Sequence, residues 1–253
     1  MATQATPLEI TSLAHYTAYL ERHCDRDDLL FRGQREDRPL LPKLARLKYS
    51  DEEDILVAEQ RMFDDFKRQA LPFLDTRPSG DWDWLALAQH HGMATRLLDW
   101  TSNPMVALWF AVERAPVGDA PGVVWVFQTS EDDHILPEDE ASPFAGDRTR
   151  VFRPPHITRR IIAQSGWFTA HKYLDHKKRF IALEKNKAYK QRLTRLRVPA
   201  HRFCDIRRAL DRSGFNSAAL YADLDGLSRH IEWRHSLLQD EVSLNPGLRL
   251  RSA

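Results

Sequence analysis

Eight polar side chains of types that bind anions or transfer protons fall in two short stretches of this 253-residue chain. One stretch supplies Arg32, and the other supplies Gln89, His90, His91, Arg96, Asp99, Thr101 and Ser102. The Thr101-Ser102 hydroxyls come just before an expected helix start, where unpaired N–H groups and the positive end of the helix dipole attract anions. The spacing therefore predicts a site for phosphates or other anions.

The second stretch is expected to be two apolar helices around a polar loop. Asp81 is a capping residue for a first helix that ends at Gly92, with Trp84, Leu87 and His91 on one face. Asn103 and Pro104 are typical of a second helix start. Its residues 105–112 carry no polar face, which predicts burial. Residues 95–100 form the loop, and its two charges need partners if they are buried.

The first stretch predicts a short buried strand, Leu29-Leu30-Phe31-Arg32, followed at Gly33 by a turn or by a close approach of the backbone to a ligand. An arginine at the end of a buried strand suits a fixed carboxylate or phosphate, because its planar fork binds either in bidentate fashion. The alternative is a structural salt bridge, with Asp99 as the candidate partner. For the Arg-Gly dipeptide taken alone, this alternative is the better supported.

Together these residues closely resemble the FRG domain family. The resemblance rests on Phe31-Arg32-Gly33-Gln34, Gln89-His90-His91-Gly92, Thr95 to Thr101, Asn103-Pro104 and Ala107-Leu108 through Phe110-Ala111. It extends from about Leu8 to about Trp233, and includes Leu40-Leu41-Pro42, Gln164 to Phe168 and Leu224 to Leu227.

The order of motifs is also remotely similar to that of Arg-Ser-Glu type ADP-ribosyltransferases. The resemblance implies NAD as substrate, held by Arg32, with the Thr101-Ser102 turn supporting the nicotinamide pocket. In that superfamily a glutamate on a later hairpin strand assists the transfer. The corresponding segment of this chain is 160–164, which has Arg160 and Gln164 in place of the expected acids.

By this resemblance the catalytic candidates are Arg32, His90, Asp99 and Gln164. The candidates for contacts with NAD are Gly33, Gln34, Gln89, His91, Arg96, Thr101, Ser102 and Asn103. Asp99 or Glu184 could stabilise oxocarbenium-like charge, and Arg32 and Arg96 could clamp the diphosphate. His90 or His91 could orient a ribose hydroxyl or act as a base near neutral pH, against a simpler capping and packing role. No metal site is expected.

Three function classes follow. The first is an ADP-ribosyltransferase-like or NAD-cleaving enzyme, of the kind found among bacterial toxins and phage-defence effectors. The second is a non-catalytic regulatory module that binds nucleic acid or nucleotides, which the missing glutamate favours. The third is a protein-interaction scaffold, since seven tryptophans and an apolar helix can be core alone.

Mixed helices and strands without a strict βαβ rhythm predict an α+β fold, with a mixed or split sheet flanked by helices, which the resemblance implies to be ADP-ribosyltransferase-like. We expect one domain over 8–240 between tails at 1–7 and 241–253. Its parts are a helical part over about 8–115, a strand-rich basic part over about 122–215 and a helix over about 224–238.

The expected helices span 12–22, a long segment after a capping box at Ser50–Glu53 that ends at Pro72, and 201–212. The expected strands span 122–127, a hairpin within 159–169, 180–183 and 193–198. Residues 128–155 are rich in acids and prolines, which predicts a surface excursion or lid.

Positive charge is concentrated in one part of the chain. Residues 146–212 hold 19 lysines or arginines against 5 acids, a net charge of +14, while the remainder carries −13. A surface for nucleic acid or for a protein acceptor is one interpretation. Contact between basic and acidic halves, within the fold or across a dimer, is the other.

Two further expectations concern the setting of the protein. No long apolar run or signal-peptide pattern is present, so we expect a cytoplasmic protein without a membrane partner. Cys24 and Cys204 are expected to be free thiols.

Overall fold

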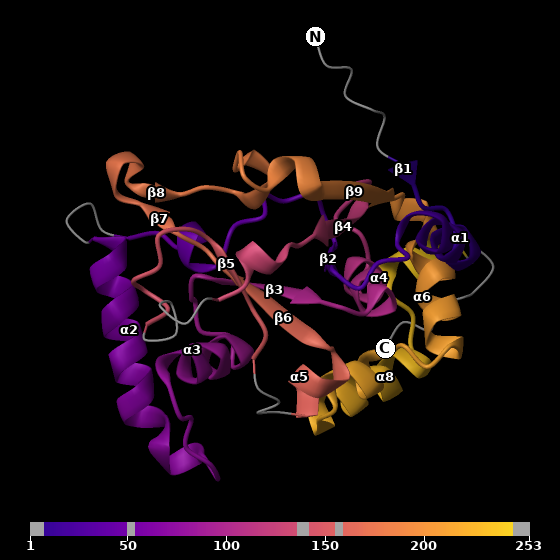
Figure 1. Cartoon of the computed structure of the whole chain (residues 1–253). Coiled ribbons are helices and arrows are strands. Elements are labelled where there is room, and N and C mark those ends of the chain that lie inside the picture. The colour runs from indigo at the N-terminus through magenta and orange to yellow at the C-terminus, as the bar shows by residue number, and fades with distance from the viewer. Residues whose placement is uncertain (1–7, 50–53, 136–141, 155–158, 245–253) are drawn as a thin grey trace.

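A mixed seven-stranded sheet, in the order β1-β9-β4-β2-β3-β6-β5, runs through the middle of the computed structural model (Figure 1). The structure describes residues 8–49, 54–135, 142–154 and 159–244. In these residues β1 pairs with β9 in parallel, and the other neighbours in the sheet are antiparallel. A separate two-stranded sheet joins β7 and β8.

The strands are β1 (Leu8–Glu9), β2 (Leu29–Gln34), β3 (Leu97–Thr101), β4 (Gly122–Gln128), β5 (Arg150–Phe152), β6 (Gly166–Ala170), β7 (Tyr173–Leu174), β8 (Arg179–Phe180) and β9 (Leu193–Val198). The helices are α1 (Leu13–His23), α2 (Ile55–Ala70), α3 (Asp81–His90), α4 (Pro104–Val112), α5 (Arg159–Ala163), α6 (Phe203–Arg212), α7 (Ser217–Tyr221), α8 (Leu224–Arg234) and α9 (Gln239–Leu244).

Helices cover one face of the sheet in two separate groups. Over β9, β4 and β2, the helices α1, α4 and α6 bury a cluster that includes Phe31, Val126 and Leu196. Over β3, β6 and β5, the helices α2 and α3 bury a second cluster around Leu97 and Phe168. The two groups stand on either side of β3 in Figure 1. Residues of β3 that face this side therefore lie where one helical layer gives way to the other.

The opposite face is covered mainly by irregular segments. Leu30, Leu98, Trp100 and Phe127 pack there against residues from the 40s and the 180s. Two buried bonds connect this layer, from Trp100 Nε1 to Thr169 Oγ1 at 3.0 Å and between that hydroxyl and His171 Nε2 at 3.1 Å. The Trp100 indole N–H and the Thr169 hydroxyl are thus satisfied within this layer.

The α+β fold with a mixed sheet flanked by helices is confirmed, as are several expected elements. Ser12 caps α1 through a bond to the N–H of His15, and Asn103 caps α4 through a bond to the N–H of Met105. Residues of α4 are almost wholly buried, as its missing polar face predicts. Strands β2, β4 and β9 and helix α6 match their expected positions within two residues.

Other expectations are wrong. The expected polar loop at 95–100 contains β3, because its residues pair with β6 along the whole strand. The expected first hairpin strand at 159–164 is helix α5, which brings Arg160 over the Tyr221 ring at 4.5 Å. Gly80, not Asp81, is the N-cap of α3.

Three expected boundaries also change. The segment 128–155 was expected to be a surface excursion or a lid. Part of it instead belongs to the fold, because β5 pairs with β6 at the edge of the sheet and the side chain of Asp133 is buried. The expected strand at 180–183 is reduced to β8, with Leu183 already in a 3-10 turn. The C-terminal helix ends at Arg234, and α9 follows it. The expected tail at 241–253 begins inside α9, where Glu241 is buried. The rest of that tail from 245 onward, the expected tail at 1–7 and the expected capping box at 50–53 lie outside the described residues.

Cys24 and Cys204 are free thiols, as expected. Among the helices in the described part of the chain, none combines the length and apolar character needed to cross a bilayer.

Candidate functional site

The three residues Phe31-Arg32-Gly33 each have a distinct structural task. Phe31 is 4 % exposed and packs in the core under α4. Gly33 faces the same helix so closely that a Cβ atom there would lie 1.8 Å from the carbonyl oxygen of Ala107. Any side chain would therefore force α4 away from the sheet. Arg32 lies between these two residues and points to the opposite face of the sheet. Of the three side chains of the motif, it is the one that can contact a ligand.

Arg32 lies where β2 and β3 stop pairing. Strand β2 pairs with β4 along its full length, whereas its pairing with β3 is recorded only between Phe31 and Thr101. Beyond that pair, Arg32 Nη1 donates to the carbonyl oxygen of Asp99 at 2.7 Å. Between β2 and β3, in the centre of the sheet, the backbone hydrogen bonds stop and leave an opening. The Arg32 guanidinium there makes the hydrogen bond to β3 that a backbone N–H of β2 would otherwise make.

Asp99 is the exposed residue in an otherwise buried strand. Its side chain is 58 % exposed, and its Oδ2 lies 3.6 Å from Arg32 Nη1. Gln89 Nε2 donates to Oδ2 at 3.0 Å, and Gln89 Oε1 accepts from the hydroxyl of Thr95 at 2.7 Å. The bond from Thr95 fixes the orientation of the Gln89 amide, which in turn fixes the carboxylate. A held but accessible carboxylate on a central strand is suited to contact a ligand.

A small cavity next to this opening is rich in arginine. It has a volume of about 180 Å³, and its lining includes Arg32, Arg35, Arg38 and Arg46 but a single acid, Glu36. Glu36 is already paired with Arg38. The cavity therefore has more guanidinium groups than carboxylates, which suits an anionic ligand.

The pKa values of two arginines reflect this crowding. Burial lowers the pKa of Arg32. The negative charge of Asp99 acts against this decrease, and the positive charge of nearby Arg46 adds to it. Burial likewise lowers the pKa of Arg46, with a further contribution from Arg38. Among the described residues, Arg32 Nε is buried without a hydrogen-bond partner. A phosphate in this cavity would relieve both the repulsion and the unsatisfied donor.

His90 and His91 lie at the end of α3, beside Gln89. Their rings meet edge to face at 4.9 Å. Burial, together with nearby Arg160 and His91, lowers the pKa of His90 to about 4, although Asp223 and Asp99 act in the opposite direction. His90 is therefore a neutral imidazole at pH 7. It can accept or donate a hydrogen bond, but its pKa does not suit the expected base poised near neutrality.

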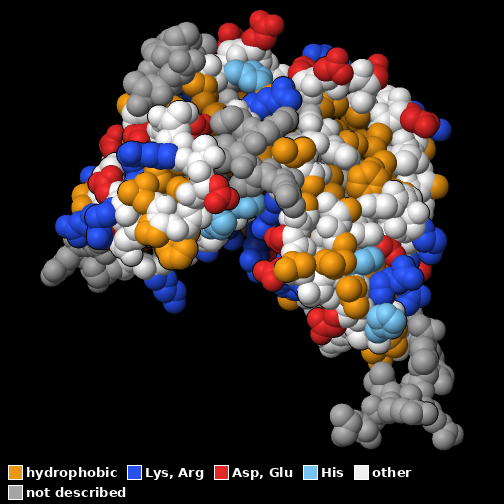
Figure 2. Space-filling model, turned by 90° about the horizontal axis from the view of Figure 1, so that it is seen from below, with side chains coloured by type: hydrophobic (Ala, Val, Ile, Leu, Met, Phe, Trp, Pro, Cys, Tyr) orange, Lys and Arg blue, Asp and Glu red, His pale blue; other side chains and the backbone are white. Residues whose placement is uncertain are grey.

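The surface around these residues is hollowed. Figure 2 shows a notch between the side that carries α2 and α3 and the side that carries α5 and α8, with histidine and basic side chains gathered inside it. The electrostatic contacts of His90 with Arg160, Asp223 and Asp99 join the same two sides. Asp99, Gln89 and His90 thus lie together, as the sequence predicted, and Arg32 joins them from the adjacent strand.

Arg96 does not belong to this group. Its Nε and Nη2 bind the carboxylate of Glu59 on α2 at 2.9 and 2.5 Å, and the two side chains are 5 % and 2 % exposed. Its guanidinium also lies over the Phe144 ring at 4.9 Å. The charge that was expected to clamp a ligand is instead satisfied inside the protein.

The turn before α4 is also largely committed to structure. Thr101 Oγ1 donates to the carbonyl oxygen of Gln164 at 2.6 Å and accepts from the N–H of Asn103. Gln164 Nε2 donates to the carbonyl oxygen of Leu220. The Asn103 side chain caps α4, so the expected anion position at this helix start is already filled. The side chain of Ser102 remains exposed, while Gln34 Oε1 accepts from Trp125 Nε1.

Sequence reasoning missed the cavity arginines and Glu59. Arg35, Arg38 and Arg46 follow the motif within 15 residues, and this density of arginine was the available signal. Glu59 carried no signal, because an acid on a helix with a polar face is ordinary. In the described residues, no group of three His, Cys, Asp or Glu side chains could hold a metal ion.

Comparison with known proteins adds one finding. A search of curated proteins and a search of solved structures returned no match. The segment 27–119, which contains Arg32, Gln89, Asp99 and helix α4, matches the family model of the FRG domain, and this match supports the FRG family for that part of the chain.

Proposed function

We propose that the opening between β2 and β3 binds the phosphates of a nucleotide, with NAD as the ligand to test first. The observation that carries the proposal is the position of Arg32, between the accessible carboxylate of Asp99 and a cavity lined by three further arginines. A diphosphate would accept from Arg32 and Arg46, while Asp99 would remain at the edge of the site.

Chemistry at such a site would centre on Asp99. When the bond between the ribose C1′ and the nicotinamide nitrogen breaks, its electron pair leaves with nicotinamide and positive charge develops on the ribose. A carboxylate held by Gln89 could stabilise that charge without moving. Water or a nucleophile on an acceptor would then add at C1′ and lose its proton. His90, neutral at pH 7, would serve as a hydrogen-bond partner to a ribose hydroxyl.

An enzyme of this kind would act as an NAD-cleaving or ADP-ribosyltransferase-like effector, and a bacterial toxin or phage-defence role would follow from depletion of NAD or modification of a target. The family match at 27–119 supports the FRG domain.

One observation favours a second candidate, a regulatory module that binds a nucleotide without cleaving it. The segment expected to supply a glutamate forms α5, and the Gln164 amide at its end is bonded to Leu220. Asp99 would then have to act on the ribose without the help of a glutamate from this segment.

The test is release of nicotinamide from labelled NAD by the wild type, by Asp99→Asn and by the control Asp28→Asn, which alters an exposed Arg–Asp pair elsewhere. We expect turnover by the wild type and the control and at least a hundredfold loss in Asp99→Asn, by analogy with removal of other electrostatic stabilisers. Binding of NAD without release, with or without cell extract as acceptor, would support the regulatory module instead.

A further inference from the structure

The basic segment divides into two parts in the structure. Several of its arginines are paired with acids, as in Arg192 with Asp133 at 2.5 Å and Arg207 with Asp240 at 2.7 Å. Arg195 pairs with Asp37 at 2.8 Å. The positive charge of these three arginines is therefore balanced by acids from other parts of the same fold.

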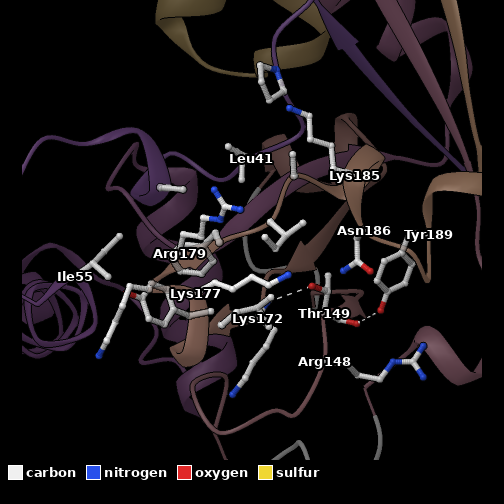
Figure 3. Close-up of a pocket in the computed structure, with 18 of the residues that line it drawn as sticks. Leu41, Ile55, Arg148, Thr149, Lys172, Lys177, Arg179, Lys185, Asn186 and Tyr189 are labelled. Carbon is white, nitrogen blue, oxygen red and sulfur yellow. Dashed lines mark hydrogen bonds between the residues drawn. The ribbon is translucent and has the colours of Figure 1, made fainter.

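A second group of cations is left over and lines one large hollow. The hollow has a volume of about 1470 Å³ and shares Pro39 and Leu41 with the arginine cavity. Figure 3 shows basic side chains around it from several segments. The six that remain unpaired are Lys172, Lys177, Lys178, Arg179, Lys185 and Lys187.

Within the part of the chain that the structure describes, none of these six makes an ion pair. The acids that line the hollow are Asp54 and Asp147, and Asp147 lies 3.5 Å from Arg150. Five of the six cations are exposed, and Lys172 is half-buried. Six like charges around one concave surface repel one another and concentrate counterions, which a bound polyanion would displace.

The walls of the hollow are suited to more than phosphates. Leu41, Tyr49 and Ile55 are partly buried apolar residues beside a small cluster that contains Tyr173 and Phe180. At the other side, the hydroxyl of Tyr189 donates to the carbonyl oxygen of Thr149 at 2.5 Å, which fixes that wall (Figure 3). Cations around a concave floor with apolar side chains match the grooves that bind single strands, which expose both phosphates and base faces.

We propose that this hollow binds single-stranded nucleic acid, with the six cations on its phosphates and the apolar wall against its bases. A double helix keeps its bases stacked inside and presents a convex surface, so it fits a concave hollow less well than a flexible strand. The site is separate from the Arg32 opening, although the two adjoin at Leu41.

The experiment is titration of the full chain with a fluorescein-labelled 20-nucleotide RNA of mixed sequence, over a series of salt concentrations. The test variant replaces Lys177, Arg179 and Lys185 with glutamine. The control replaces Arg22, Arg77 and Arg212, which are exposed and lie outside the hollow, so that the net charge changes equally. Thermal midpoints are measured in parallel.

The wild type and the control are expected to bind with a steep salt dependence. The test variant should lose about two units of the slope of log affinity against log salt, which is about a hundredfold in affinity at 0.1 M salt. Its thermal midpoint should be unchanged. Arg32→Gln should bind RNA normally, so that failure at the nucleotide site is distinguishable from failure here.

Three outcomes would overturn the proposal. Equal losses in the test variant and the control would show that net charge, not the hollow, attracts RNA. Equal or tighter binding of a duplex of the same length would remove the single-strand assignment. Absence of salt-dependent binding of either RNA or single-stranded DNA by the wild type would remove the site itself.

Discussion

Arg32 Nη1 lies 2.7 Å from the backbone carbonyl oxygen of Asp99 and 3.6 Å from its carboxylate. The shorter contact is to the backbone, so Arg32 bridges the strand opening even without the charge of Asp99. The Asp99 carboxylate is 58 % exposed, so water screens its attraction to Arg32 and this ion pair contributes little to stability. The geometry thus separates a structural contact, made by the backbone, from an accessible carboxylate.

The first prediction follows from that separation. Asp99→Asn should change the free energy of unfolding by less than about 1 kcal/mol, because the Asp99 carboxylate is exposed to water and the amide oxygen of asparagine can still accept from Gln89. Urea denaturation provides the measurement. A loss of about 3 kcal/mol would mean that the charge pair, and not the backbone contact, holds the opening together.

Gly33→Ala is expected to destabilise the protein by about 1–3 kcal/mol or more, because the new methyl group would collide with the carbonyl oxygen of Ala107 in α4. The change is measured by chemical denaturation. Gly166→Ala is the control, since a Cβ atom there meets only ordinary contacts at 3.5 Å and beyond. Similar stabilities for the two variants would contradict the close packing of β2 on α4.

Glu59→Gln should cost about 3–5 kcal/mol of unfolding free energy, because it leaves the buried Arg96 guanidinium without a counter-charge. The matched control is Asp65→Asn, which alters an exposed pair with Arg68 and should have an effect below about 0.5 kcal/mol. If Glu59→Gln were as stable as the control, Arg96 would be free to serve a ligand, contrary to its place in the structure.

A pH dependence is expected from His171. Burial lowers the pKa of this histidine to about 3, with Arg32 and Arg96 contributing and a backbone bond at Ile181 opposing. In the unfolded chain the imidazole binds a proton below about pH 6.5, whereas in the fold it does so only near pH 3. Its contribution to stability is therefore complete above pH 6.5 and is lost as the pH falls toward 3.

The loss should be about 1.4 kcal/mol for each pH unit below 6.5. It is measured as the difference in pH profile between the wild type and His171→Gln from pH 7 to pH 4.5. The exposed His176, changed to glutamine, serves as the control and should leave the profile unchanged. Parallel profiles for the wild type and His171→Gln would mean that His171 is not held neutral by the fold.

Local signals explain which elements could be predicted from the sequence. Asn103 and Pro104 determine the start of α4, and the apolar character of residues 105–112 determines its burial. Gly33 indicated a turn or a close approach of the backbone to a ligand, and the structure shows a close approach to Ala107 of α4. These features depend on neighbouring residues and could be inferred without knowing the rest of the fold.

The elements that could not be predicted depend on distant partners. β3 carries an Asp amid apolar residues and resembled a loop, but pairing with β6 makes it a strand. The partner of Arg96 lies 37 residues away on α2. Asp99 and Arg32 are both candidates from the sequence and they lie in contact in the structure. The arginines at 35, 38 and 46 join them only through the fold, which places their segment around the same cavity.

The most direct measurement of the central claim is calorimetric titration of NAD, and of ADP-ribose, into the wild type, Arg46→Gln and the control Arg26→Gln. Arg46 lines the cavity and makes no ion pair with the described residues. Arg26 is exposed, pairs with Asp28 and does not line the cavity. Loss of one guanidinium bond to a phosphate should weaken binding about tenfold to a hundredfold in Arg46→Gln and not in Arg26→Gln. Equal affinity in all three proteins, or no binding by the wild type, would contradict a nucleotide site at the Arg32–Asp99 opening.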